Sequence, residues 1–273
     1  MTRRSEMRSS IIDVWDVQTY DTDLVAMLAK HGQLLVDYFR TDQEIDAEYK
    51  SSNHIMRRDN PFAPAFMRLV DEVSGEMNSR TIRGWHYTRI TDDELERVRS
   101  AGLAPSTIQG LRDRLDRRVT VGDFTEAQAD AIFAGSPFHG QAASRGGKLY
   151  MIANPEPHDY DGLEGILGHW GGESAYFWQE DPDILNLLRV TGQAAIIEIA
   201  MPMSASEHLA SAGSSVVHRF ALSLGCSCET KDFELYTTQP LPTSAILNVH
   251  VDGGDLFQRV ARGYPERYPN EDA

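Results

Sequence analysis

The sequence has few cysteines and no long apolar run. Two cysteines occur in 273 residues, Cys226 and Cys228, and they stand too close together for an ordinary disulfide. A C-x-C pair without a second pair of ligands is also a weak metal signal, so we expect a reducing compartment and no metal. No apolar run approaches the roughly 20 residues that span a bilayer, and none follows the basic residues 1–8 as in a secretory signal. These absences predict a soluble cytoplasmic protein.

The chain also has fewer basic than acidic residues. The chain has 26 Lys and Arg against 41 Asp and Glu, for a net charge of −15. Because nucleic-acid binding neutralises phosphates with Lys and Arg, this balance disfavours a surface broadly coated with nucleic acid. Residues 97–118 are the exception, since they hold six arginines and two aspartates, a local balance of +4. Either this segment is a solvated helix face with i,i+3 and i,i+4 ion pairs, or it is a small surface that faces an anion.

The sequence shows no internal repeat and no Gly-rich dinucleotide fingerprint, and its first third is helical in pattern. Apolar residues at helical spacing predict helices over 22–40 and 64–78, with His31 packed in the first. A capping box at Thr91 and Glu94 predicts a helix over 92–100 that ends at Gly102. Further helices are expected over 106–117 and from Thr125 to near Gly135.

Strand patterns dominate from Lys148 onward. We expect strands over 148–153, 194–201, 215–223, 232–237 and 245–251, with helices over 162–168 and 172–178 between them. Helices first and strands later, without regular βαβ alternation, indicate an α+β fold. We therefore divide the chain into a helical N-terminal region, 1–80, and a second domain, 81–273.

A short aromatic segment starts the second domain and suggests a function. His86, Tyr87 and Thr88 form a predicted strand that precedes the capped helix and Gly102. This order resembles the opening of the ADP-ribosyltransferase superfamily, in the His-Tyr-Glu branch that includes diphtheria toxin and the poly(ADP-ribose) polymerases, most closely its bacterial toxins. The resemblance covers about residues 80–252 and implies a split two-sheet β core with flanking helices. Tyr87 stands where the family often has Gly.

Later segments match the family's remaining elements in order. The strand with Tyr150 and the helix with Ser174 and Tyr176 resemble its second motif, and the strand that opens at Glu234 resembles its catalytic strand. The resemblance implies that Glu234 is catalytic and that NAD is a substrate, bound by the following residues: His86, Tyr87, Thr88, Tyr150, Ser174 and Tyr176.

These residue types suit cleavage of the bond between nicotinamide and ribose. That reaction passes through an oxocarbenium-like state, which a carboxylate such as Glu234 stabilises; the same group can take a proton from the acceptor. Two tyrosines can sandwich the cationic nicotinamide, while His86 holds the adenosine-side ribose. No metal is required.

Four other residues are weaker candidates for the pocket. Glu198 competes with Glu234 as the catalytic carboxylate, but it lies inside an apolar strand. Trp170 either caps the nicotinamide pocket or is a core residue. Glu173 either favours a helix start or lines the acceptor side, and Arg145 either reaches the pyrophosphate of NAD or belongs to a turn.

The expected activity is transfer of ADP-ribose from NAD to a macromolecule, either protein or nucleic acid. Asp232, two residues before Glu234, disfavours modification of arginine. Two alternatives stay open: a NAD glycohydrolase, or a non-catalytic module that binds NAD or ADP-ribose and docks a partner through residues 1–80. Because a NAD-consuming modifier would harm its host, we also expect a toxin or phage-defence role and a neutralising antitoxin protein.

Overall fold

A computed structural model describes residues 11–51, 56–155, 163–207 and 209–260. The basic residues 1–8 and the start of the helix expected at 162 lie outside these ranges. Contacts divide the chain into two compact units, Met1–Arg83 with Ala200–Leu235 and Gly84–Ile199 with Tyr236–Ala273. The first unit therefore joins the helical N-terminal region to a segment from much later in the chain.

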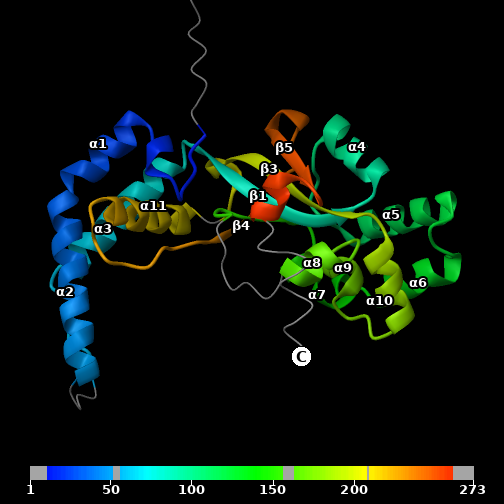
Figure 1. The fold of residues 1–273 in the computed structure, drawn as a ribbon, viewed down its shortest axis with the longest axis horizontal. Helices are drawn as coiled ribbons and strands as arrows, with labels where there is room; N and C mark the ends of the chain where they lie inside the picture. The colour runs from blue at the N-terminus through cyan, green and yellow to red at the C-terminus, as the bar shows by residue number, and fades with distance from the viewer. Residues whose placement is uncertain (1–10, 52–55, 156–162, 208, 261–273) are drawn as a thin grey trace, which may run out of the picture. The chain divides into compact units, whose positions relative to one another are not determined.

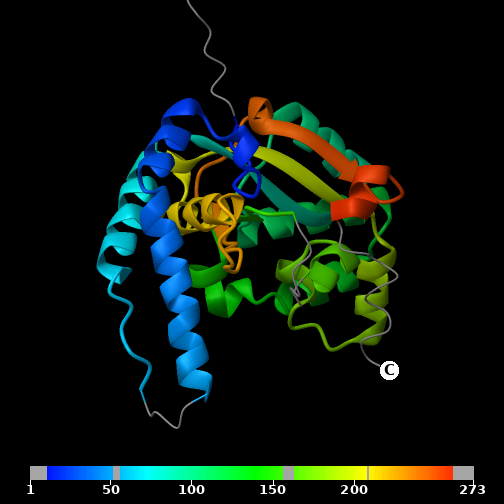
Figure 2. The same cartoon turned by 60° about the vertical axis from the view of Figure 1, so that its left-hand side comes forward.

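Four main helices make up the first unit: α1 (Thr22–Lys30), α2 (Gly32–Ser51), α3 (Ala63–Met77) and α11 (Leu209–Ser223). Asp21 caps α1 by accepting a hydrogen bond from the backbone N–H of Leu24 at 2.9 Å. The single helix expected over 22–40 is interrupted at His31, which is the C-cap of α1. Helix α3 matches its expected range closely. Figure 2 shows α2 in blue running beside α3 in cyan.

Helix α11 packs against α3 (Figure 1). A Cβ added to Gly213 of α11 would lie 2.1 Å from Ser74 Oγ and 2.7 Å from the Val70 carbonyl oxygen, so the two backbones approach closely there. The strand predicted over 215–223 is wrong, because these residues belong to α11. A short apolar run does not distinguish strand from buried helix, and Ala212, Val216 and Phe220 are buried at helical spacing.

One five-stranded sheet has the order β4-β2-β1-β3-β5. Its strands are β1 (Thr81–Ile90), β2 (Leu149–Ile152), β3 (Gln193–Pro202), β4 (Glu234–Thr237) and β5 (Ile246–Val251). Strands β1 and β2 pair antiparallel with Trp85 opposite Ile152, and β3 pairs antiparallel with β5. The α+β class is confirmed. The split into two sheets is not, since the described residues form a single sheet.

The second unit contains further helices. They are α4 (Asp92–Ala101), α5 (Ile108–Val121), α6 (Glu126–Ala134), α7 (Phe138–Arg145), α8 (Leu163–Gly168), α9 (Glu173–Tyr176), α10 (Pro182–Val190) and α12 (Asp255–Val260). A capping box starts α4 at Thr91 and Thr125 caps α6, both as predicted; Gln128 completes a second capping box at Thr125. The buried cluster between α5, α6, α9 and α10 includes Leu115, Ile132 and Trp170.

Three short 3₁₀ helices complete the secondary structure: η1 (Val17–Thr19), η2 (Met203–Ala205) and η3 (Thr243–Ala245). Within the described ranges, no helix is long and apolar enough to cross a membrane.

Candidate functional site

His86 and Tyr150 meet on the neighbouring strands β1 and β2. The Nδ1 atom of half-buried His86 lies 2.7 Å from the backbone carbonyl oxygen of Tyr150. Because a carbonyl only accepts, Nδ1 carries the proton and Nε2 of the neutral ring is an acceptor. Burial lowers the pKa of His86, as does the charge of Arg114, against the opposing hydrogen bond to Tyr150. A neutral imidazole of this tautomer can accept a hydrogen bond from a sugar hydroxyl.

The residues that follow His86 alternate across β1. Tyr87 is buried at 5% exposure, whereas Thr88 is half-buried. Side chains two apart on a strand share a face, so Thr88 lies on the face of His86 and Tyr87 on the other. A ligand on the face of His86 would therefore meet the backbone of Tyr87, not its ring.

Tyr150 has an aromatic neighbour that the sequence did not single out. Its ring centroid lies 5.2 Å from that of Tyr236 on β4, and Lys148 Nζ lies 4.6 Å from the Tyr236 centroid. The Tyr150 hydroxyl and Lys148 Nζ both donate to the carbonyl oxygen of Ser144, at 3.0 and 2.9 Å. Tyr150 remains 39% exposed. The two rings and the ammonium group form a surface on which a planar ligand can stack.

The second expected tyrosine, Tyr176, contacts another aromatic ring. Tyr176 stacks on His169 with centroids 4.8 Å apart, and burial raises its pKa to about 12. No ring contact joins Tyr176 to Tyr150 among the described residues. Ser174 is buried and donates to the carbonyl oxygen of Gly171 at 2.7 Å. The tyrosine sandwich around nicotinamide stays a prediction, because two rings on opposite faces of a ligand do not contact each other.

Trp170 is a core residue. Its side chain is fully buried, and Nε1 donates to Glu94 Oε2 at 2.8 Å. The ring also meets Phe124 edge to face, with centroids 5.3 Å apart.

Arg145 and Glu173 form an ion pair with each other. The Arg145 guanidinium also lies 4.2 Å from the Phe177 ring centroid, and its Nε donates to Gln141 Oε1 at 2.5 Å. Phe177 and Trp178 stay 43% and 46% exposed. The charge of Arg145 is therefore matched within the protein.

The two rival glutamates differ in their surroundings. Glu198 is buried on β3, where a bulge interrupts the pairing with β5, and its Oε1 lies 2.7 Å from His250 Nε2. Glu234 is the exposed first residue of β4. Alternation puts Glu234 on the same face of β4 as Tyr236, the neighbour of Tyr150.

His86 and Tyr150 lie on β1 and β2, which pair in the sheet. By contacts Glu234 belongs to the first unit, while Tyr150 and His86 belong to the second.

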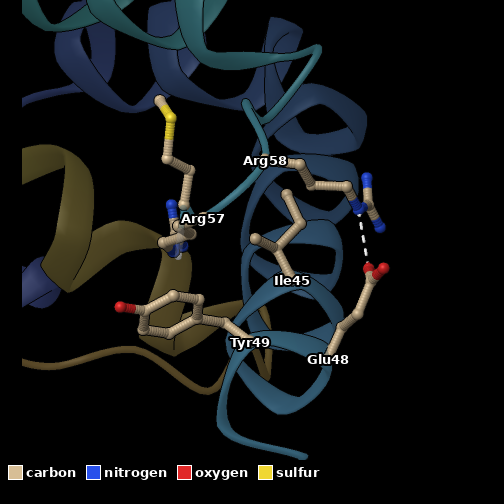
Figure 3. Close-up of a pocket in the computed structure, with 6 residues that line it drawn as sticks. Ile45, Glu48, Tyr49, Arg57 and Arg58 are labelled. Carbon is tan, nitrogen blue, oxygen red and sulfur yellow. Dashed lines mark hydrogen bonds and ion pairs between the residues drawn. The ribbon is translucent and has the colours of Figure 1, made fainter. Parts of the chain in front are cut away.

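A pocket of about 160 Å³ lies in the first unit and is lined by residues between Ile45 and Arg58 (Figure 3). Ile45 and Tyr49 of α2 line it, and Arg58 closes one side through an ion pair with Glu48 at 2.8 Å. None of the predicted site residues lines this pocket. Among the described residues, no group of three His, Cys, Asp or Glu side chains could hold a metal ion.

No protein-family model, curated protein or solved structure matches the chain.

Proposed function

We propose that the protein is a NAD-dependent ADP-ribosyltransferase that transfers ADP-ribose to a protein or a nucleic acid. The observation that supports this most is the contact of His86 with the strand of Tyr150, where Nδ1 of His86 lies 2.7 Å from the Tyr150 carbonyl oxygen and the Tyr150 ring stays exposed. The proposed His-Tyr-Glu set is His86, Tyr150 and Glu234. A split two-sheet core belongs to this proposal, as does a toxin or phage-defence role in the cytoplasm, checked by an antitoxin protein.

The chemistry assigns one task to each side chain. The neutral His86 accepts a hydrogen bond from the adenosine-side ribose through Nε2, and exposed Tyr150 stacks on the nicotinamide ring. The Glu234 carboxylate bonds the other ribose and stabilises positive charge as the bond to nicotinamide breaks. Nicotinamide leaves with the bonding electrons, the acceptor attacks the ribose carbon, and Glu234 takes the proton of the acceptor.

Glu234 is favoured over Glu198 as the catalytic carboxylate. The side chain of Glu198 is buried and held by His250 at 2.7 Å, so a substrate would have to displace that partner. Glu234 is exposed on its strand.

The test is release of nicotinamide from NAD by the full chain. Glu234→Gln should lower the rate at least about 100-fold, since removal of a catalytic acid or base costs that much. Glu229→Gln is the matched control, because Glu229 is an exposed glutamate of the segment before β4, and its rate should stay that of the unmodified chain. An unchanged rate for Glu234→Gln, or loss with Glu198→Gln alone, would remove Glu234 from the mechanism.

A second measurement identifies the acceptor. The chain is incubated with NAD labelled in its adenylate half and with cell extract, and the product is then digested with protease or with nuclease. Label released by only one digestion identifies the acceptor class. Nicotinamide release without any labelled macromolecule would instead indicate a NAD glycohydrolase, and NAD binding without release a non-catalytic module.

A further inference from the structure

The face shared by α4 and α5 carries arginines that its carboxylates do not fully satisfy. Asp93, Glu94 and Arg97 lie within one turn of α4, and Arg114, Arg117 and Arg118 lie within one turn of α5. Residues three and four apart on a helix are neighbours on its surface. The contacts of each guanidinium therefore decide what this face can bind.

Two of these arginines have carboxylate partners within the protein. Arg118 is buried, and its Nη atoms donate to Asp93 Oδ1 at 2.6 Å and to Asp123 Oδ2 at 2.8 Å. Arg114 donates from Nε to Glu94 Oε1 at 2.7 Å, and its guanidinium lies 4.6 Å from the Trp170 ring centroid.

Arg117 is different. It is half-buried, and the described residues provide it with no hydrogen bond or ion pair; its Nε atom is buried with no acceptor. Burial lowers its pKa, and the charges of Arg97 and Arg114 lower it further, although Glu94 and Asp113 oppose them. Arg97 has its Nη2 atom 2.9 Å from Asp93 Oδ2, but this contact is not aligned as a hydrogen bond. Arg117 is thus held near two other arginines, and the described residues provide it with no carboxylate partner of its own.

We propose that Arg117, assisted by Arg97 and Arg114, binds a phosphate group. A phosphate offers several acceptor oxygens and up to two charges, so it can meet more than one guanidinium at once, and the planar fork of Arg matches it with paired hydrogen bonds. A phosphate beside the guanidinium of Arg117 would also offset the repulsion from the like charges of Arg97 and Arg114. The phosphate belongs to a nucleic-acid backbone or to a small molecule such as pyrophosphate. The site is independent of the proposed function, because binding needs neither NAD nor Glu234.

The test is binding of a fluorescein-labelled single-stranded oligodeoxynucleotide by the full chain, with inorganic pyrophosphate as competitor. Arg117→Gln should weaken binding about tenfold or more, the loss expected when a charged hydrogen bond is removed. Arg99→Gln is the matched control, since Arg99 is an exposed arginine of α4 paired with Glu96, and its affinity should change less than about twofold. Displacement by low pyrophosphate identifies a small-molecule site; resistance to it identifies a nucleic-acid backbone.

The melting temperature distinguishes phosphate binding by Arg117 from a purely structural role of this residue. Because Arg117 has no partner to lose, Arg117→Gln should leave the melting temperature unchanged or raise it while affinity falls. A lower melting temperature would show a structural arginine and overturn the proposal. It would also be overturned if neither the oligonucleotide nor pyrophosphate bound the unmodified chain, or if Arg99→Gln weakened binding as much as Arg117→Gln.

Discussion

At the scale of single residues, Glu94 has more roles than its place in a capping box suggests. It accepts a hydrogen bond from the backbone N–H of Thr91 at 3.0 Å, one from Trp170 Nε1 at 2.8 Å and one from Arg114 Nε at 2.7 Å. Burial by itself would raise the pKa of Glu94, but the charge of Arg114 and these hydrogen bonds together hold it below its usual 4.5. The carboxylate thus joins the start of α4 to α5 and to the Trp170 core.

Glu94 should make the fold sensitive to acid. Its folded-state pKa is lower than its unfolded value, so its contribution to stability is present above pH 4.5 and is lost as pH falls below it. Glu94→Gln should therefore cost about 3–5 kcal/mol at pH 7, because it leaves Arg114 without its partner, and should flatten the acid limb of a plot of unfolding free energy against pH. Denaturant unfolding between pH 7 and pH 3 measures both effects.

Glu96→Gln is the control for this measurement, since Glu96 is exposed and pairs only with Arg99. Some acid dependence remains in either variant, because hydrogen bonds from Thr91 and Arg118 and the ion pair with Arg97 overcome burial and lower the pKa of Asp93 to about 2. An acid limb of Glu94→Gln as steep as that of the unmodified chain would contradict the assignment.

Sequence patterns located some of the candidate residues but not their neighbours. The strands with His86 and Tyr150 were predicted correctly, since each is a short β-branched or aromatic run with clear ends. The pairing of Tyr150 with Tyr236 was missed, because strand order depends on contacts between segments distant in the chain. The sequence leaves the position of Trp170 open, because its complete burial and its bond to Glu94 depend on contacts between distant segments.

At the scale of elements, local signals explain what was predicted. Capping boxes fix the starts of α4 and α6 through hydrogen bonds within four residues, so they are visible in the sequence. The apolar run of α11 favours a strand, and that prediction is wrong. What makes it helical is the partner α3, from much earlier in the chain, and tertiary packing is absent from local pattern.

Two glycines, one on α11 and one on α3, should change the stability in opposite directions when replaced by alanine. Gly213→Ala should destabilise the protein by about 1–3 kcal/mol, because its Cβ would overlap Ser74 and the Val70 carbonyl. Gly75→Ala, on α3 itself, should stabilise it by about 0.5–1 kcal/mol, since a Cβ there meets no atom within 4 Å and alanine favours the helix. Thermal unfolding of both variants checks the sign. Equal effects would show that α11 does not approach α3 at Gly213.

At the scale of the whole molecule, each compact unit is assembled from segments distant in the sequence. The first unit takes Met1–Arg83 and Ala200–Leu235, so its amides should share a common opening free energy despite the long stretch of chain between them. A single boundary at residue 80 does not describe a unit made of two separate segments. Composition indicates where the character of the chain changes, whereas a folding unit is defined by contacts between residues that can lie far apart in the sequence.

Hydrogen exchange of Gly213→Ala tests this organisation. The substitution should speed exchange in α11 and also in α3 and α2, which pack with it, because opening of one helix exposes the others. Amides of α5 and α6 in the second unit should keep their rates, since their core around Leu115 and Ile132 contains no residue of α11. If α5 and α6 accelerated as much as α3, the chain would open as one cooperative unit. Faster exchange confined to α11 would instead mean that α11 is an appendage rather than part of the core of the first unit.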